Sequence, residues 1–416
     1  MTKIERVERT YRLEPVDRPP FVPAIYEHKG RLVGKSPSEI CRNEEALCEA
    51  LLREAQVYDP DMLVVGVDVY NVEAEAIGCE IVYFDDSDDV PGVASVALKS
   101  KGDLGSLRVP DPRTDGRMPM YLRVAERVRE ALKGEMLVRG AVTGPFSLAS
   151  ELFGAERFLL TTVDDPEFAR RLMEFAARAT VEFGRAFIER GVDPIIFDSR
   201  AMPALSSPKV FKSLVAPVYR DLVIPALKEA GARYIPLIIG GDTTSVLEEL
   251  IETGATQLLC DFEGDVERFK ERCLAARRPF RGNVDPRLVH KGPASEIRKA
   301  ALRLLEKGFG HPGFLFGCGV VAYDCDESHV LALREALEDV AAGRVDFDQE
   351  LGRVKGSVAP GGIGAGDGAP ASPRREAGIV LDGGEGAGPA ARDGEAAGGR
   401  GAGAPASGGR PDVSAP

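Results

Sequence analysis

Eight apolar runs of strand length follow one another along the first 345 residues, and they constrain the fold more than any other feature. They are FVPAIY (21–26), MLVVGV (62–67), MLVRGAV (136–142), PIIFD (194–198), YIPLII (234–239), QLLCDF (257–262), FRGNV (280–284) and FLFGC (314–318). Most runs are apolar continuously rather than at alternate positions, which is typical of strands covered on both faces. Such strands are parallel and are joined by helical crossovers.

Helical patterns lie between the runs. The triplet Asp-Pro-Glu at 165–167 predicts a helix start, with an N-cap, a proline in the first turn and an early acid, and apolar residues then recur at helical spacing as far as Phe183. Ser207, followed by proline, predicts a second start, and the polar residues at 243–245 offer caps for a third. The segment YLRVAERVREALKG (121–134) predicts a helix that ends at its glycine.

Eight strand–helix units in about 345 residues favour a closed (β/α)8 TIM barrel of the α/β class over an open doubly wound sheet. An open sheet usually carries a glycine-rich phosphate loop after its first strand, and YEHKGRLVG (26–34) contains no GxGxxG. The segment before Phe21 is expected to be an N-terminal extension of the barrel. Residues 81–107 are expected to be an insertion.

Composition restricts the classes of partner. The chain has 416 residues and a formal net charge of −13, and its 53 basic residues form no cluster, which argues against binding to nucleic acid. The N-terminal sequence MTKIERVERT is charged, and no uncharged apolar run is long enough to span a bilayer. We therefore expect a cytoplasmic protein with no membrane partner. The seven cysteines are an odd number, are scattered, and lie in a chain too long to need disulfides, so we expect reduced thiols. The absence of a CxxC pair excludes a self-contained zinc ribbon.

The composition changes abruptly near the end of the chain. From about Val354 onward, runs such as GGIGAGDGAP contain almost no large apolar residue. Such a segment cannot bury enough surface to offset the entropy lost on ordering. We therefore divide the chain into a barrel domain at 1–345 and a disordered tail, rich in glycine, alanine and proline, at 346–416.

A barrel of this class places its active site at the carboxyl ends of its strands, and this rule selects candidate residues. They are Glu27, His28, Arg31, Asp68, Tyr70, Thr143, Asp198, Ser199, Arg200, Gly240, Gly241, Asp242, Asp261, Asn283, Asp285 and Cys318. Several have an alternative structural interpretation. Asp198 and Asp261 are also suited to cap loops, Asn283 and Asp285 to shape a turn before proline, and Cys318 to pack as an inert thiol.

Six stretches in this order span nearly all of residues 1–345: LEPVDRPPFVP (13–23), VDVYNVEAEAIGCEI (67–81), GAVTGPFSLASELFG (140–154), FDSRAMPALSSPKVFKSLVAPVYRDL (197–222), RGNVDP (281–286) and FGCGV (316–320). As an ordered set they resemble the uroporphyrinogen decarboxylase superfamily, and within it most the branch of corrinoid:thiol (coenzyme M) methyltransferases. The resemblance implies a (β/α)8 barrel whose mouth accepts a tetrapyrrole, either a porphyrinogen or a corrinoid.

Departures from the decarboxylase pattern bear on the reaction. Decarboxylases of this family carry RQAGR after the first strand, and the matching residues here are EHKGR (27–31), so the first arginine has become an acid. The family's substrate-facing tyrosine falls on Glu151, and its late histidine falls on Cys318. Asp68 and Ser199 match the family pattern, in which the aspartate holds the pyrrole N–H groups. An acid at position 27 would repel a substrate with many carboxylates.

The methyltransferase branch holds zinc through an HxC pair and a cysteine in a GCG turn, and this zinc activates a thiol. Cys318 stands at the position of the last ligand, but the HxC pair aligns with Ile238 to Gly240, where neither end can bind zinc. The resemblance therefore leaves two alternatives. Either Cys318 binds a metal with other partners, such as His28, Glu27 or Asp242, or the zinc chemistry has been lost.

Three functions remain as expectations. The leading one is methyl transfer between a corrinoid, free or on a partner corrinoid protein, and a small acceptor. Its predicted catalytic residues are Asp68, Cys318 and Asp198, and its predicted substrate-binding residues are His28, Arg31, Ser199, Asn283 and Asp285. The second is decarboxylation of a porphyrinogen, in which Asp68 stabilises a protonated pyrrole. The third is a tetrapyrrole-binding protein without catalysis.

Overall fold

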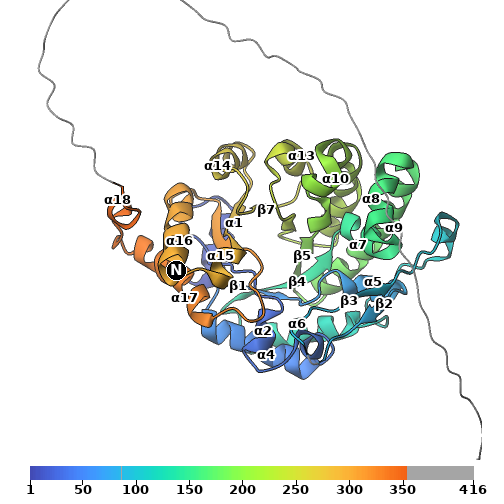
Figure 1. Cartoon of the computed structure of the whole chain (residues 1–416), viewed down its shortest axis with the longest axis horizontal. Coiled ribbons are helices and arrows are strands. Elements are labelled where there is room, and N and C mark those ends of the chain that lie inside the picture. Colours follow the sequence, from blue (N-terminus) through green and yellow to red (C-terminus); the bar gives the residue numbers. More distant parts are fainter. Residues whose placement is uncertain (86, 354–416) are drawn as a thin grey trace, which may run out of the picture. The chain divides into compact units, whose positions relative to one another are not determined.

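Parallel strands form the centre of the molecule in the computed structural model, which describes residues 1–85 and 87–353 (Figure 1). Two sheets carry seven of the strands. The first has the order β1 (Met62–Val65), β4 (Leu137–Thr143), β5 (Asp193–Phe197) and β6 (Leu237–Ile238). The second has the order β7 (Leu258–Cys260), β8 (Phe280–Val284) and β9 (Phe314–Cys318). All pairings within these two sheets are parallel.

Short bridges join the two sheets into a ring. A parallel bridge from Pro236 to Gln257 links β6 to β7. On the other side, segment 21–24 acts as the eighth strand, because it forms parallel bridges to Phe316 of β9 and to Val320 just beyond it. The amide of Asp61, just before β1, donates to the carbonyl of Phe21 at 2.9 Å. The prediction of a closed (β/α)8 barrel is confirmed, and all eight predicted runs supply strand segments or bridges.

The seam between segment 21–24 and β1 contains a buried lysine. Lys29 is fully buried, and its Nζ donates to the carbonyls of Val64 and Gly66 at 2.9 and 3.2 Å. The same Nζ lies 3.3 Å from Glu54, which is also buried. Segment 21–24 is too short to pair fully with β1. The ammonium group of Lys29 therefore supplies the hydrogen bonds that backbone amides of a longer strand would donate to these carbonyls.

Helices surround the strands, and the chain passes round the ring once, from α4 at the bottom of Figure 1 through α9 and α13 to α16 and α17 at the left. The longer helices are α1 (Lys3–Tyr11), α4 (Glu44–Tyr58), α5 (Asn71–Ile77), α6 (Met118–Ala131), α7 (Pro145–Phe153), α8 (Ala155–Asp164), α9 (Pro166–Ile188), α10 (Pro203–Val210), α14 (Val266–Ala275), α16 (Ala294–Gly308) and α17 (Glu327–Ala341). The shorter ones are α2 (His28–Arg31), α3 (Pro37–Ile40), α11 (Ala216–Val218), α12 (Ile224–Glu229), α13 (Leu247–Glu252), α15 (Pro286–Lys291) and α18 (Phe347–Glu350). Short helical segments of the 3-10 or π type lie at Lys101–Ser106, Ser199–Ala201, Phe211–Val215, Tyr219–Val223 and Thr244–Val246.

The helix starts predicted from sequence lie at or near real ones. Asp165 caps α9 by accepting from the amide of Phe168 at 3.1 Å. Ser207 lies inside α10 at a kink, with φ of 62°, and its Oγ accepts from the amide of Val210, so it caps the second part of that helix. The hydroxyls expected to cap the turn at 243–245 form no cap bond there.

The bottom of the barrel is closed by the N-terminal helix α1, which was predicted as an extension. Val7 and Tyr11 of α1 pack with the inward residues Met62, Leu137 and Leu315 in one apolar cluster. This plug leaves the opposite end, at the carboxyl ends of the strands, as the open mouth.

The predicted insertion at 81–107 contains an antiparallel hairpin of β2 (Glu80–Val82) and β3 (Gly92–Ser95). At the other end of the fold, α18 lies beyond the predicted domain boundary at 345, and Phe347 packs against the core. The remainder of the predicted tail, 354–416, lies outside the described residues.

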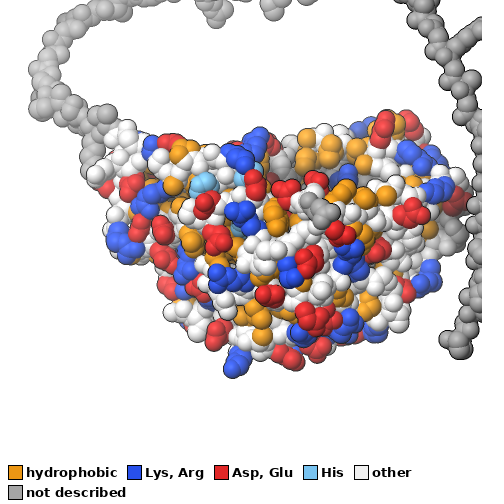
Figure 2. Space-filling model, turned by 60° about the horizontal axis from the view of Figure 1, so that its bottom comes forward, with side chains coloured by type: hydrophobic (Ala, Val, Ile, Leu, Met, Phe, Trp, Pro, Cys, Tyr) orange, Lys and Arg blue, Asp and Glu red, His pale blue; other side chains and the backbone are white. Residues whose placement is uncertain are grey.

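The surface carries both signs of charge. On the face shown in Figure 2, Lys and Arg side chains are interspersed with Asp and Glu side chains. Throughout residues 1–85 and 87–353, each helix is too short or too polar to traverse a bilayer.

Candidate active site

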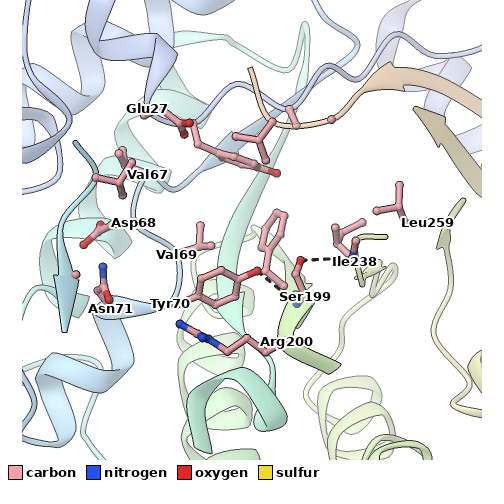
Figure 3. Close-up of a pocket in the computed structure, with 18 of the residues that line it drawn as sticks. Glu27, Val67, Asp68, Val69, Tyr70, Asn71, Ser199, Arg200, Ile238 and Leu259 are labelled. Carbon is pink, nitrogen blue, oxygen red and sulfur yellow. Dashed lines mark hydrogen bonds between the residues drawn. The ribbon is translucent and has the colours of Figure 1, made fainter. Parts of the chain in front are cut away.

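A cavity of about 430 Å³ lies at the mouth of the barrel (Figure 3). Its wall is formed by residues at or just beyond the ends of segment 21–24, β1, β5, β6, β7 and β9, by two residues of β8, and by residues 90–93 of the β2–β3 hairpin. Small-molecule sites usually measure roughly 300–1,000 Å³. The mouth at the carboxyl ends of the strands is also where (β/α)8 enzymes carry out their chemistry.

Asp68 lies in this wall, where the chain turns from β1 into α5 (Figure 3). Both oxygens of its buried carboxylate accept from Arg117, at 3.1 and 2.7 Å, and the hydroxyl of Tyr121 donates to it at 3.0 Å. Burial and the charge of Asp68 raise the pKa of Tyr121 well above its usual value. Asp68 therefore reaches the cavity as part of a buried ion pair rather than as a free carboxylate.

Ser199 connects three loops of the cavity. Its Oγ accepts from the amide of Gly240 at 3.4 Å, and its own amide donates to the hydroxyl of Tyr70 at 3.4 Å, as Figure 3 shows. The next residue, Arg200, donates to Glu151 of α7 at 3.0 and 2.5 Å. The loops after β1, β5 and β6 are thus held together by hydrogen bonds that run along the cavity wall.

Two further carboxyl groups face the cavity. Burial raises the pKa of the Glu27 carboxyl above its usual value, and the nearby charge of Lys29 offsets part of this effect. Asp261, after β7, accepts from the amide of Gly241 at 2.9 Å and from Nδ2 of Asn283 at 2.9 Å. Asn283, a predicted substrate-binding residue, therefore lies in the wall beside Asp261.

Arg281 is a cavity residue that the sequence interpretation missed. It precedes Asn283 by two positions on β8, so both side chains point to the inside of the barrel. The signal was present in the sequence, because a charged residue two positions before a predicted site residue, in an otherwise apolar strand, shares its face.

Cys318 does not line the cavity, although Gly319 and Val320 do. On β9, Leu315 packs with the inner cluster above α1, whereas Phe316 and Cys318 pack in the main core. Burial raises the pKa of the Cys318 thiol to about 12, and a backbone interaction with Ala24 offsets part of that shift. The geometry therefore favours the packed, inert thiol over the predicted catalytic cysteine.

His28 and Arg31 also lie outside the cavity wall. His28 is fully buried, with Nε2 at 2.6 Å from the hydroxyl of Tyr58 and Nδ1 at 3.1 and 3.0 Å from the carbonyls of Ala322 and Tyr323. Since carbonyls only accept, Nδ1 carries the proton and Nε2 accepts from Tyr58. Arg31 is exposed. His28 thus ties α2 to the loop after β9.

We expect His28 to make stability depend on pH. Burial holds its pKa below the ordinary value of 6.5, and its two carbonyl contacts offset this only in part. The unfolded chain therefore binds a proton more readily, so this contribution is complete above pH 6.5 and is lost as the pH falls toward the folded pKa. In urea titrations between pH 7.5 and 5, wild type should lose more stability than His28→Asn, and equal losses would contradict the assignment.

Asp198 and Asp285 both accept hydrogen bonds from backbone amides at the start of a helix. Asp198 is fully buried outside the cavity wall, and it accepts from the amides of Phe146 and Ser147 at the start of α7 and from the hydroxyl of Tyr219. Asp285 caps α15 by accepting from the amide of Arg287 at 2.9 Å. The structural alternative that the sequence left open therefore describes both residues better than a direct role in the cavity.

The side chains present do not form the zinc site of the resembled methyltransferases. Ile238 and Gly240 both line the cavity and offer no donor, while the thiol of Cys318 faces away from it. Among residues 1–85 and 87–353, no group of three or more His, Cys, Asp or Glu side chains is placed to hold a metal ion. The alternative in which Cys318 recruits His28, Glu27 or Asp242 finds no support in this arrangement.

Comparison with known proteins gives the family. Residues 2–340 match the family model of uroporphyrinogen decarboxylase (URO-D). The chain belongs to the URO-D family.

Curated URO-D relatives include enzymes of two kinds. The chain is 28% identical over 330 residues to the methylcobamide:CoM methyltransferase MtbA of Methanosarcina mazei, an alignment that covers 77% of this chain and 93% of the relative. It is 24% identical over 358 residues to the uroporphyrinogen decarboxylase of Alcanivorax borkumensis, covering 81% and 97%. A solved structure of a methyltransferase from Methanosarcina mazei has a TM-score of 0.73 at 24% identity, covering 82% of this chain and 99% of that one, and it supports the barrel fold.

Proposed function

We propose that this URO-D family member transfers a methyl group between a corrinoid and a small molecule held inside the barrel mouth. The size of the cavity carries the proposal. A volume of about 430 Å³ suits a small molecule, whereas a tetrapyrrole macrocycle would have to lie across the opening. The similarity to a methylcobamide:CoM methyltransferase over 93% of that relative's length supports an arrangement in which the small molecule lies inside the cavity and the corrinoid lies across its opening.

The rim of the cavity suits the face of a macrocycle. Val90 and Val320 both line the cavity, yet they remain 37% and 47% exposed. Apolar side chains exposed at a cavity rim often mark a binding surface. In this proposal they would hold the corrinoid, which supplies an electrophilic methyl group when bound. A cytoplasmic location and an interaction with a corrinoid protein belong to the same proposal.

The cavity residues have separate roles in such a transfer. An acceptor of the form X–H must lose its proton as the X–CH3 bond forms. Asp68 and Glu151 are engaged in ion pairs with Arg117 and Arg200. Asp261 already accepts hydrogen bonds from Gly241 and Asn283. This leaves the carboxylate of Glu27 as the better placed proton acceptor in the cavity wall. Its raised pKa moves it toward the range in which a general base is effective.

The direct test is an anaerobic assay with methylcobalamin and a panel of small thiols, amines and hydroxy compounds. The proposal expects loss of the methyl group from methylcobalamin that depends on both enzyme and acceptor, with a methylated product found by mass spectrometry. A parallel assay supplies uroporphyrinogen, because relatives of this chain include uroporphyrinogen decarboxylases. Decarboxylated product without any methyl transfer would replace this proposal with the second function.

A charge on the rim should weaken use of the corrinoid. Val320→Asp places a carboxylate where the macrocycle would lie, and we expect KM for methylcobalamin to rise about tenfold or more. The matched control is Val163→Asp, the same substitution at a valine of α8 that is 73% exposed and outside the cavity wall. Equal KM values for the two variants would contradict binding at this rim.

A further inference from the structure

Arg281 is a buried cation in the cavity wall that has no partner among the described residues. The residue is 3% exposed, and its Nε is buried without a hydrogen-bond partner. Within the described part of the chain, Arg281 forms neither an ion pair nor a hydrogen bond through its side chain. The arginine stem lies beside Gly317 of β9, where an added Cβ would be 3.6 Å from Cδ of Arg281, an ordinary contact, and would collide with the carbonyl of Val22.

The other cations around the cavity are already neutralised. Arg117 pairs with Asp68 and Arg200 pairs with Glu151. Burial of an unpaired guanidinium group is unfavourable by several kcal/mol, so such groups in proteins normally have an anion beside them. The wall of this cavity therefore presents one cation that forms no ion pair with a described residue, although the carboxylates of Glu27 and Asp261 lie elsewhere in the same wall.

A second unsatisfied atom lies at the next inward position of β8. Nδ2 of Asn283 donates to Asp261, which fixes the orientation of the amide, because a carboxylate accepts and does not donate. Oδ1 of Asn283 is then left buried without a partner. Arg281 and Asn283 thus offer an unused donor and an unused acceptor on the same face of one strand, both in the cavity wall.

We infer that the small molecule bound in this cavity is an organic acid that also carries an N–H or O–H group. Its carboxylate, sulfonate or phosphonate binds the guanidinium of Arg281, which is suited to hold such groups by two parallel hydrogen bonds. Its N–H or O–H donates to Oδ1 of Asn283. This inference rests on the proposed function only in treating the cavity as the site of the small molecule, and it specifies the class of that molecule.

The arrangement also gives the bound molecule a direction. Arg281 pairs in register with Leu315, which belongs to the apolar layer above α1, whereas Asn283 stands two residues closer to the mouth. The acidic end therefore lies at the floor of the cavity, and the donor-bearing end points toward the rim.

The test uses binding, measured by calorimetry and thermal unfolding on the full-length protein without corrinoid. Taurine, β-alanine and 2-aminoethylphosphonate supply an anion and a donor, and they distinguish sulfonate, carboxylate and phosphonate. Propane-1-sulfonate and propionate lack the donor, and ethanolamine lacks the anion. Each is titrated into wild type, Arg281→Met and the control Arg287→Met, the same substitution at an exposed arginine outside the cavity wall.

We expect at least one of the three bifunctional acids to bind wild type and Arg287→Met, and to bind Arg281→Met roughly ten- to a hundredfold more weakly. The matched acid without a donor should bind more weakly than its bifunctional counterpart, and ethanolamine should bind weakly to all three proteins. Without ligand, Arg281→Met should unfold at a temperature no lower than wild type, because it loses an uncompensated buried charge.

Three results would overturn the inference: no acid binds wild type, the acids bind Arg281→Met as tightly as wild type, or unliganded Arg281→Met is markedly less stable. The last result would assign Arg281 a structural role. Since no corrinoid is present, failure of the methyl-transfer assay leaves a positive binding result intact. Conversely, methyl transfer to a neutral acceptor together with no acid binding would overturn this inference and leave the proposed function standing.

Discussion

Replacement of Arg139 by methionine is expected to lower the free energy of unfolding by about 3–5 kcal/mol. Arg139 points into the lower part of the barrel from β4 and is fully buried. Its Nη1 donates at 3.0 Å to Asp193, the residue paired with it in register on β5. Methionine fills a similar space but leaves the Asp193 carboxylate, whose side chain is only 9% exposed, without its main counter-charge. It also removes cation–π contacts with Tyr11 and Tyr234.

Urea unfolding at pH 7 measures this loss, and Arg281→Met without ligand is the matched control. Both arginines point into the same barrel, but Arg139 has a carboxylate partner, whereas Arg281 has none within residues 1–85 and 87–353. The control should change the free energy of unfolding by no more than about 1 kcal/mol, or raise it. Similar losses in the two variants would mean that both arginines are structural, which contradicts the distinction between them.

The number and position of the strands were predictable because each is an isolated apolar run between polar helical segments. The run MLVRGAV at 136–142 corresponds to β4, Leu137–Thr143, and FRGNV at 280–284 is β8 itself. A strand inside a (β/α)8 barrel contacts helices on one face and the barrel interior on the other. Both environments favour apolar residues, and the position of each strand could therefore be read directly from composition.

Because both faces of these strands are apolar, the orientation of their side chains could not be predicted from sequence. When both faces of a strand are apolar, the sequence does not show which alternate set faces inward. Position at the end of a strand selected Cys318 and Asn283 equally, yet Asn283 faces the cavity and Cys318 faces the helices. A shift of one residue along a strand would exchange its inward and outward side chains. The register between β8 and β9 fixes which set faces inward, and this register cannot be predicted from the residues near either position.

Partners distant in sequence account for the remaining differences. His28 was predicted to bind substrate at the mouth, but Tyr58 and the carbonyl groups at 322–323 enclose it. Asp68 was predicted to face the mouth. Its ion-pair partner Arg117, which donates to both of its carboxylate oxygens, follows 49 residues later and could not be predicted from the residues near Asp68. The positions at the mouth of the barrel are therefore predictable from sequence, whereas the hydrogen bonds and ion pairs of the side chains there depend on tertiary contacts.

Asp198→Ala is expected to lower the free energy of unfolding by about 3–5 kcal/mol, because three buried donors lose their acceptor. The amide of Ser147 and the hydroxyl of Tyr219 each lie 2.6 Å from the carboxylate, and the amide of Phe146 lies 3.2 Å from it. The two amides are at the N-terminus of α7, where the helix dipole favours a negative charge. The loss is measured by urea unfolding at pH 7.

Two further variants separate this structural role from the catalytic role that the sequence also allowed. Asp285→Ala removes a cap at another strand end, but its side chain is partly exposed, and we expect a loss of only about 1 kcal/mol. Tyr219→Phe should cost less in the Asp198→Ala background than in wild type, because the two side chains share one hydrogen bond. If Asp198→Ala instead unfolds like wild type but abolishes turnover, the carboxylate acts in the reaction itself, and its contacts with α7 and Tyr219 are secondary. The proposed network requires the opposite order: stability falls first, and activity falls only because the loop that begins with Ser199 loses its support.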